Sequence, residues 1–165
     1  MTATIKGFEP LYIQRIAQLT NKSNQFNLTT LRCSEDDIRA MAGNKNDLCL
    51  CGKLVDKFGD NGIVTVVAGR KQGDVLDLTL WLMSCRVLKR GMEDAMMDTV
   101  VAEAAARGVK TIVGHYYPTA KNAMVREFYA QYDFAKTAED ADGNTEWTLD
   151  IAAYTPKHPH MKIER

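Results

Sequence analysis

The chain has 165 residues, of which 45% are hydrophobic and 25% charged, and its 21 Lys and Arg balance its 21 Asp and Glu. These values are typical of a globular protein and argue against a disordered or fibrous chain, and the zero net charge indicates no nucleic-acid or membrane partner. No apolar run approaches the ~20 residues that span a bilayer, and residues 1–9 lack the apolar core of a secretory signal, so we expect a cytoplasmic protein.

The first third of the chain predicts one strand and two helices. Residues 3–8 predict a short strand, and residues 11–19 predict a helix because their apolar side chains recur at helical spacing. Residues 21–30 are polar and rich in amide side chains, which predicts a loop. Ser34 followed by three acidic residues is typical of a helix start, and Gly43 is a suitable end, so we expect a second helix over 34–42.

The middle of the chain predicts an antiparallel meander. Three apolar segments, residues 48–58, 63–68 and 75–83, are separated by the turn-forming sequences FGDNG and GRKQGD. From Gly91 the apolar spacing becomes helical, and Arg107-Gly108 marks the end of that helix.

The last third predicts a further helix and three strands. Residues 110–116 read as a short buried strand, and Pro118-Thr119 opens a predicted helix that runs to about Gln131. Residues 133–137 and 145–150 are expected to pair across a turn, and residues 156–165 are expected to be irregular.

The cysteines indicate a reduced protein without a metal centre. Cys49 and Cys51 share one face of a predicted strand, which favours packing in the core. A zinc site would need converging ligands, and His158 and His160 lie in the tail. The four cysteines are too few and too irregularly spaced for a disulfide framework: Cys33, Cys49, Cys51 and Cys85.

The order of elements, β-α-α-β-β-β-α-β-α-β-β without an internal repeat, predicts one α+β domain over residues 1–165. We expect a mixed, mostly antiparallel central sheet flanked by helices. This order resembles that of the GCN5-related N-acetyltransferase (GNAT) fold. Residues 84–93, SCRVLKRGME, stand where GNAT proteins have the loop that binds the pyrophosphate of acyl-CoA.

That loop carries part of the GNAT pattern Arg/Gln-x-x-Gly-x-Gly/Ala. Arg86 and Gly91 match, whereas Lys89 replaces the first glycine. Glycine allows backbone N–H groups to approach a phosphate closely, and a following helix adds free N–H groups and the positive end of its dipole. The alternative is a solvated basic turn. The resemblance implies binding of CoA or acetyl-CoA by Cys85, Arg86, Val87, Lys89, Arg90, Gly91 and Met92.

A second resemblance lies in residues 122–134, which match the GNAT pattern N-x-x-a-x-x-F-Y-x-x-x-G-F except for Asp133 in place of glycine. It implies that Asn122 bonds the pantetheine arm, that Tyr129 protonates the departing thiolate, and that the strand over 75–85 presents backbone groups to the pantetheine. The alternative for Tyr129 is a core tyrosine. Asp133 predicts a left-handed turn, which Asp tolerates better than most residues.

Few residues suit acid–base chemistry. His115 is the only histidine before the tail and is the candidate general base. Cys85 lacks a paired base, so packing is the more ordinary role for it. Asp74 and Asp77 superficially resemble a haloacid-dehalogenase nucleophile loop, but they are three residues apart where that chemistry needs two, so this site is excluded.

A narrower resemblance covers most of the chain. Residues 15–30, 57–63, 84–93 and 118–122 resemble the C-terminal domain of FkbH-like proteins, which make glyceryl-acyl carrier protein for polyketide extender units. This implies an acyl thioester on CoA or on the phosphopantetheine of an acyl carrier protein. It also implies a phosphatase-like (HAD) domain upstream, which is absent here, so we expect an excised domain or a truncated paralogue.

The same resemblance makes residues 21–30 a candidate binding loop. Side chains that donate and accept hydrogen bonds suit a small hydroxylated acyl group, whereas the alternative is a loop whose amides cap neighbouring backbone. The residues expected at the acyl end are Asn24, Gln25, Asn27 and Thr29. The sequence thus predicts an acyltransferase, with a non-catalytic carrier-protein docking domain or an ordinary amine N-acetyltransferase as alternatives.

Overall fold

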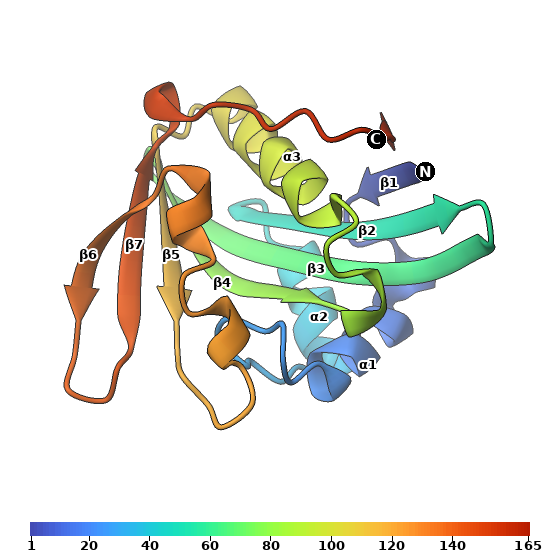
Figure 1. Ribbon diagram of the computed structural model, residues 1–165, viewed down its shortest axis with the longest axis horizontal. Helices are drawn as coiled ribbons and strands as arrows, with labels where there is room; N and C mark the ends of the chain where they lie inside the picture. Colours follow the sequence, from blue (N-terminus) through green and yellow to red (C-terminus); the bar gives the residue numbers. More distant parts are fainter.

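The computed structural model describes residues 1–165 and is built on one eight-stranded sheet (Figure 1). Its strands are β1 (Thr2–Lys6), β2 (Asp47–Asp56), β3 (Gly59–Gln72), β4 (Val75–Met83), β5 (Thr111–Tyr116), β6 (Ala135–Glu139), β7 (Thr145–Asp150) and β8 (Lys162–Glu164). Their order across the sheet is β6-β7-β5-β4-β3-β2-β1-β8. Only the β4–β5 and β1–β8 pairs are parallel, so the predicted mixed, mostly antiparallel sheet is confirmed.

Three α-helices cover the two faces of this sheet. They are α1 (Ile13–Lys22), α2 (Glu35–Ala42) and α3 (Met92–Ala106). Helices α1 and α2 lie on one face and α3 on the other (Figure 1). Short 3-10 turns complete the chain: η1 (Pro10–Tyr12), η2 (Cys85–Val87), η3 (Ala123–Val125), η4 (Tyr129–Tyr132) and η5 (Ile151–Ala153). None of these helices is long and apolar enough to cross a membrane.

A bulge in β4 redirects its side chains. Ala68 pairs with Leu80 and Gly69 pairs with Leu78, so Thr79 is an extra residue in β4. Because strand side chains alternate between faces, an extra residue reverses the alternation beyond it. Leu78 before the bulge and Trp81 after it therefore both lie in the core under α3, whereas Leu80 lies in the core under α1 and α2.

Helix α2 forms as its sequence predicts. The hydroxyl of Ser34 accepts a hydrogen bond from the backbone N–H of Asp37, and the Asp37 carboxylate accepts one from the Ser34 N–H. This reciprocal capping box satisfies two N–H groups that the first turn leaves free. The helix ends at Ala42 and Gly43 follows it, so the predicted start and end are confirmed.

The predicted helix over 118–131 is wrong. The chain instead forms η3 and η4, with backbone bonds between residues three apart, such as Val125 N–H to Asn122 O and Phe128 N–H to Val125 O. Val125, Phe128, Tyr129 and Tyr132 are all buried, which explains why their spacing looked helical. Asp133 adopts the predicted left-handed conformation, with φ of 69°.

The tail is also more ordered than expected. Residues 162–164 form β8, which pairs in parallel with β1. Before it, the backbone N–H groups of Lys157 and His158 donate to the Asp98 carboxylate of α3. Three residues with two charges carry no readable strand pattern, so this edge strand follows from tertiary contacts rather than from local sequence.

The cysteines behave as expected for a reduced core. Cys33 and Cys51 are buried, Cys49 is half-buried, and all four cysteines are free thiols. Burial raises the pKa of the Cys49 and Cys51 thiols to about 12, so both stay protonated and unreactive at neutral pH.

Candidate functional site

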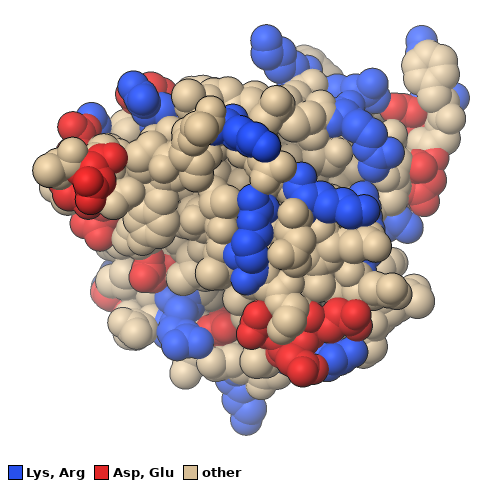
Figure 2. All heavy atoms as spheres, turned by 90° about the horizontal axis from the view of Figure 1, so that it is seen from below, with Lys and Arg blue, Asp and Glu red and all other residues tan.

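A basic cleft opens at the carboxyl end of β4. It has a volume of about 870 Å³ and lies between two stretches of the chain. One is the end of α1 with the residues that follow it, up to residue 25, and the other is residues 83–86. Its charged lining residues are Arg15, Lys22, Arg86 and Lys121. No Asp or Glu lines it, and none of the four cations forms a salt bridge. Figure 2 shows several Lys and Arg side chains together in the middle of the molecule's lower side, with a separate group of acidic side chains next to them.

Unpaired cations in a concave site attract anions, because low-dielectric walls focus their field. Arg86 was expected here from the loop motif, whereas Arg15, Lys22 and Lys121 were missed. Arg15 and Lys22 are seven residues apart on α1, which places them on one helix face two turns apart. That spacing is the only sequence signal that could have joined two of them.

Two predicted residues meet in the cleft. The exposed Cys85 thiol lies 3.2 Å from the side-chain oxygen of Gln25, so its Sγ–H donates to that amide. Asn24 also lines the cleft, but its side-chain oxygen accepts a bond of 2.6 Å from Arg32. The structure thus brings Cys85, Arg86, Asn24 and Gln25 together, although the two pairs are about sixty residues apart in the chain.

The seven residues expected to bind the pyrophosphate do not face one common site. Val87 and Met92 are fully buried, so only their backbone could face a ligand. Lys89 and Arg90 border a separate hollow beside Phe58, where Arg90 contacts Asp56 at 2.5 Å. Gly91 has φ of 87° and precedes α3 as its N-cap. Only Cys85 and Arg86 of the seven predicted loop residues reach the basic cleft.

A carboxylate already occupies the start of α3. The Glu93 side chain accepts a bond of 3.2 Å from the Lys89 backbone N–H, and its other oxygen is buried without a partner. Lys89, which departs from the GNAT pattern, has φ of 62°, a conformation that glycine adopts more readily. A phosphate at this helix end would meet the negative charge of Glu93, which opposes the expected backbone cradle.

A segment from the α1–α2 loop fills the opening between β4 and β5. These strands pair only from Val75 to Asp77 and then separate. Residues 26–30, here called the inserted segment, lie in the gap. Leu28 N–H donates to Trp81 O, Met83 N–H donates to Phe26 O, and Tyr117 N–H donates to Leu28 O. In Figure 1 this blue loop runs beside the ends of β4 and β5.

Asn122 fastens the inserted segment from the other side. Its side-chain N–H₂ donates to Asn27 O at 2.9 Å and to Tyr117 O at 3.0 Å. Its side-chain oxygen accepts from Thr119 N–H at 2.8 Å and from the Tyr116 hydroxyl at 3.2 Å. Asn122, which was expected to bond the pantetheine arm, is fully buried. Both side-chain N–H groups and both acceptor positions of its side-chain oxygen are already used within the protein.

The other two residues of the polar loop also serve the fold. Asn27 is fully buried, donates to Ser23 O and accepts from Thr30 N–H. The Thr29 hydroxyl donates to Thr79 O at 2.8 Å. Thr30 has φ of 54°, which is strained for a β-branched residue, and its hydroxyl is buried without a partner. The capping alternative therefore describes Asn27 and Thr29, whereas Asn24 and Gln25 face the cleft.

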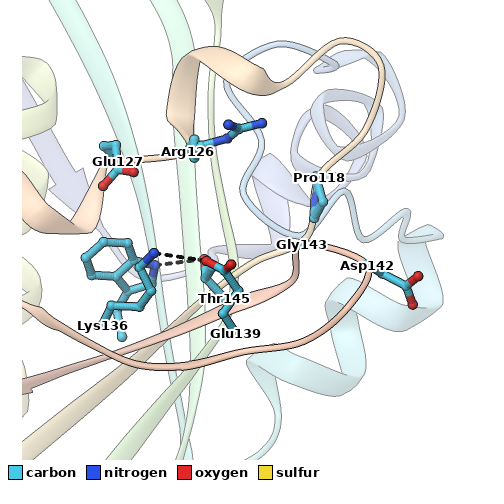
Figure 3. A pocket seen from close by; sticks show the side chains of 9 residues that line it. Pro118, Arg126, Glu127, Lys136, Glu139, Asp142, Gly143 and Thr145 are labelled. Atoms are coloured by element: carbon cyan, nitrogen blue, oxygen red, sulfur yellow. Dashed lines mark hydrogen bonds and ion pairs between the residues drawn. The ribbon is translucent and has the colours of Figure 1, made fainter.

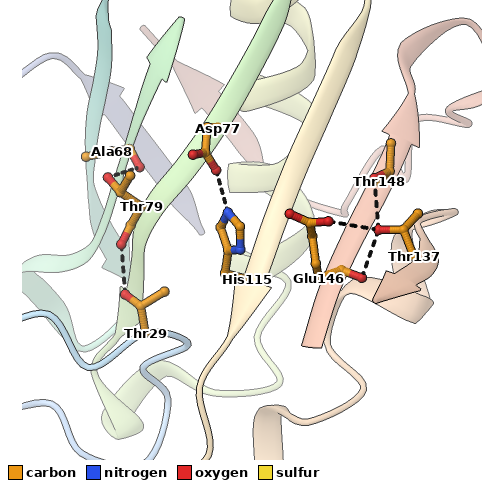
Figure 4. A network of polar contacts seen from close by, with 8 residues as sticks. All are labelled: Thr29, Ala68, Asp77, Thr79, His115, Thr137, Glu146 and Thr148. Carbon is orange, nitrogen blue, oxygen red and sulfur yellow. Dashed lines mark hydrogen bonds and ion pairs between the residues drawn. The ribbon is translucent and has the colours of Figure 1, made fainter. Parts of the chain in front are cut away.

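His115 forms a close pair with a carboxylate. Its Nε2 lies 2.5 Å from Asp77 Oδ1, at the point where β4 and β5 separate (Figure 4). Glu146 lies opposite His115 on β7, and its carboxylate accepts a bond of 3.4 Å from the Thr137 hydroxyl. A carboxylate that is hydrogen-bonded to an imidazole fixes the orientation of the ring, which suits a general base. Asp77 was missed in this role, because its partner is 38 residues away.

Tyr129 lies in the core rather than at a surface. It is 1% exposed, and its ring packs 4.8 Å from Phe134 and 6.4 Å from Trp81 between ring centroids. Burial, with a smaller contribution from the Asp77 charge, raises the pKa of its phenol. The structure thus gives Tyr129 the packing role that was its alternative.

A smaller hollow of about 230 Å³ lies between the β6–β7 hairpin and the loop after β5 (Figure 3). Its lining mixes charges, and Lys136 pairs with Glu139 at 2.9 Å. The carboxylates of Glu127, Glu139 and Asp142 outnumber the two cations of this lining, so the hollow is the weaker candidate site for an anion. No group of three or more His, Cys, Asp or Glu side chains is placed to hold a metal ion.

A comparison of the sequence with protein-family models and with curated proteins finds no match. The structure, in contrast, is similar to several solved acetyltransferases. Ard1 from Thermoplasma volcanium superposes with a TM-score of 0.71 at 16% identity, covering 91% of this chain and 98% of that one. The ribosomal-protein-S18-alanine N-acetyltransferase from Escherichia coli gives 0.68 at 16% identity, covering 90% and 94%.

A third neighbour was solved with a ligand. The PaiA N-acetyltransferase from Thermoplasma acidophilum, in complex with coenzyme A, gives a TM-score of 0.67 at 11% identity, covering 91% of this chain and 99% of that one. Sequence identities this low are evidence for a shared fold alone. The α+β chain therefore has the fold of the GCN5-related N-acetyltransferases.

Proposed function

We propose that this chain binds an acyl thioester through the basic cleft and acts as an acyltransferase. The observation that carries the proposal is the set of four unpaired cations, without a carboxylate among them, at the carboxyl end of β4. The phosphates of CoA, or of a phosphopantetheine arm, are the anions that such a site would hold. The fold supports this reading, because a neighbour of the same fold was solved with coenzyme A.

The cleft is tested by calorimetry with acetyl-CoA and a double variant, Lys22→Ala with Lys121→Ala. Each exposed cation contributes about 0.5–1 kcal/mol to an ion pair, so we expect the double variant to bind roughly 10-fold more weakly. Binding of the unchanged protein should also weaken as salt is raised. Arg39→Ala is the matched control, because Arg39 is exposed on α2 and pairs with Glu35 and Asp36 outside the cleft. Equal affinity of the double variant and the control would remove the cleft from the proposal.

Transfer is tested separately, by following thiol release from acetyl-CoA in the presence of simple amines such as spermidine. His115, held by Asp77, is the residue to substitute as the base, because it is the one imidazole that pairs with a carboxylate. His115→Ala should lower turnover without weakening acetyl-CoA binding. The ordinary amine N-acetyltransferase alternative predicts turnover with such amines, whereas a carrier-dependent enzyme does not.

The sequence resemblance supports a narrower proposal, in which the thioester belongs to polyketide extender-unit biosynthesis. The donor would then be an acyl carrier protein carrying a small hydroxylated acyl group, supplied by a phosphatase-like (HAD) partner domain. The experiment compares acetyl-CoA with glyceryl-acyl carrier protein as titrants. Tighter binding of the carrier protein, reduced by the same double variant, would support this context, and preference for acetyl-CoA would count against it.

A second candidate function is a non-catalytic domain that only holds the arm of a carrier protein. It is favoured by the distance between the cleft and the His115–Asp77 pair. Asp77 and Met83 are six residues apart on β4, which corresponds to roughly 20 Å of strand. Tyr129, the expected acid, is buried. Binding that survives Tyr129→Phe, together with no turnover of any acyl donor, would establish this candidate over the first.

A further inference from the structure

Beyond Asp77, β4 no longer pairs with β5, and such a strand edge is the natural place for an extended, amide-containing arm, because it offers backbone N–H and C=O groups in register. In this chain, other residues of the protein already bond to that edge. Trp81 O accepts from Leu28 N–H, and Met83 N–H donates to Phe26 O. Farther along the strand, Thr79 O accepts from the Thr29 hydroxyl. The chain's own inserted segment thus takes the backbone groups that a pantetheine arm would need.

The inserted segment is built into the core and cannot leave without disrupting it. Phe26 and Leu28 are 4% and 0% exposed, and the Phe26 ring packs edge-on against Phe128 with centroids 5.2 Å apart. Removing the segment would expose two large apolar side chains and leave the buried amide of Asn122 without its partner Asn27 O. A ligand arm therefore has to bind elsewhere.

The basic cleft lies directly outside the inserted segment. Residues 22–25, which precede the segment, form one wall, and residues 83–86, at the end of β4 and just beyond it, form the other. Ser23, Gln25 and Ser84 give this cleft hydrogen-bonding groups suited to the amides of a pantetheine arm. The start of α3, in contrast, carries the Glu93 carboxylate.

We infer that a thioester arm bound to this chain lies in the basic cleft, outside the sheet, while residues 26–30 keep the β4–β5 opening closed. The phosphates contact Lys22, Arg86 and Lys121, and the arm covers Cys85. This inference rests on the proposed thioester binding and specifies its route. It distinguishes the chain from a fold in which the arm enters between the two strands.

The test uses Cys85 as a reporter, because it is the one exposed cysteine. The intact protein is alkylated with iodoacetamide, with and without acetyl-dethia-CoA, an analogue in which a methylene group replaces the sulfur. Peptide mass spectrometry then gives the rate at each cysteine. We expect saturating analogue to slow alkylation of Cys85 at least fivefold. At the same subsaturating analogue concentration, Lys121→Ala should lose most of this protection and Arg39→Ala should keep it.

A second measurement follows the inserted segment itself. Hydrogen exchange of the Leu28, Met83 and Tyr117 amides should be unchanged when the analogue binds, because their bonds to β4 and to the segment persist. Faster exchange of these amides, or calorimetric binding without protection of Cys85, would overturn the inference and leave the proposed function standing. Absence of binding to both the analogue and a phosphopantetheinyl carrier protein would overturn both.

Discussion

Asn122 is the residue on which the region between β4 and β5 depends most. It is fully buried and joins four partners from three segments: Asn27 O, Tyr117 O, Thr119 N–H and the Tyr116 hydroxyl. Asn122→Ala would leave these groups unpaired in a buried site, and each such group costs about 1–3 kcal/mol when nothing replaces its partner. The bonds to Tyr117 O and Thr119 N–H are only partly buried, so water can replace Asn122 there. We therefore expect the free energy of unfolding to fall by about 3 kcal/mol, measured by urea denaturation.

The control is Asn46→Ala, because Asn46 is exposed and its side chain makes no hydrogen bond. That variant should change the free energy of unfolding by less than about 0.5 kcal/mol. A loss at Asn122 no larger than that of the control would show that its four bonds do not hold the inserted segment.

At this scale the sequence pointed to residue types more reliably than to their roles. Asn122 was expected to bind a ligand arm, and the amide does bind extended backbone, but the backbone is that of Asn27. Gln25 and Cys85 were both chosen as binding residues, yet their contact joins positions sixty residues apart. A motif specifies donors and acceptors, and only the tertiary fold decides which partner reaches them first.

At the scale of elements, β5 and η4 pack so closely that one position admits only glycine. A Cβ atom placed on Gly114 would lie 2.5 Å from Cζ of the Tyr129 ring and 2.6 Å from its Cε2. The ring is held between Trp81, Phe128 and Phe134, so it has little room to move. We expect Gly114→Ala to lower the free energy of unfolding by about 3 kcal/mol, measured by thermal and urea denaturation.

Gly7→Ala is the matched control, because the nearest atom to its Cβ would be Cys49 O at an ordinary 3.7 Å. A double variant, Gly114→Ala with Tyr129→Leu, should lose less than the sum of the two single changes, since a smaller side chain makes room for the new methyl group. Additive losses would mean that the contact between β5 and η4 does not set the spacing of these elements.

The elements that were predicted well are those whose pattern reflects burial on one face. The meander over β2, β3 and β4 and the strand β7 alternate or run apolar in the way that half-buried and buried strands do. The region 118–131 was mispredicted because η3 and η4 bury the same positions that an α-helix would. The inserted segment gave no strand signal, since Asn27 contributes only an isolated bridge to Leu82.

At the scale of the whole molecule, charge is the property that composition concealed. The net charge is zero, which excluded a general affinity for anions, but the fold gathers four unpaired cations from α1, the β4 end and the loop after β5 into one cleft. No window of the sequence contains this group, because its members span residues 15 to 121. The fold class could be predicted from the order of elements, whereas the site depends on which elements become neighbours once the chain has folded.

Three tyrosines link the packing of the whole molecule to pH: Tyr129 and Tyr132 are buried, and Tyr154 is half-buried. Burial raises the pKa of Tyr129, Tyr132 and Tyr154 above the ordinary tyrosine value of 10.0. For Tyr132 and Tyr154 the hydroxyls also donate to Asp94 and Asp98, which favours the neutral phenol further.

A pKa that is higher in the folded chain contributes stability in full below the unfolded value and loses it as pH rises toward the folded value. We therefore expect the free energy of unfolding, measured with urea under reducing conditions, to begin to fall above about pH 8.5, where the Cys49 and Cys51 thiols ionise in the unfolded chain but stay protonated in the folded one. The fall should become steeper above about pH 10, where the three tyrosines follow the same rule. The tyrosinate absorbance of these three residues should appear together with the loss of folded-state circular dichroism, because their phenols ionise readily only once the core opens. Full tyrosinate absorbance from all six tyrosines in a protein that keeps its native circular dichroism would show that the three hydroxyls are not held neutral by the fold.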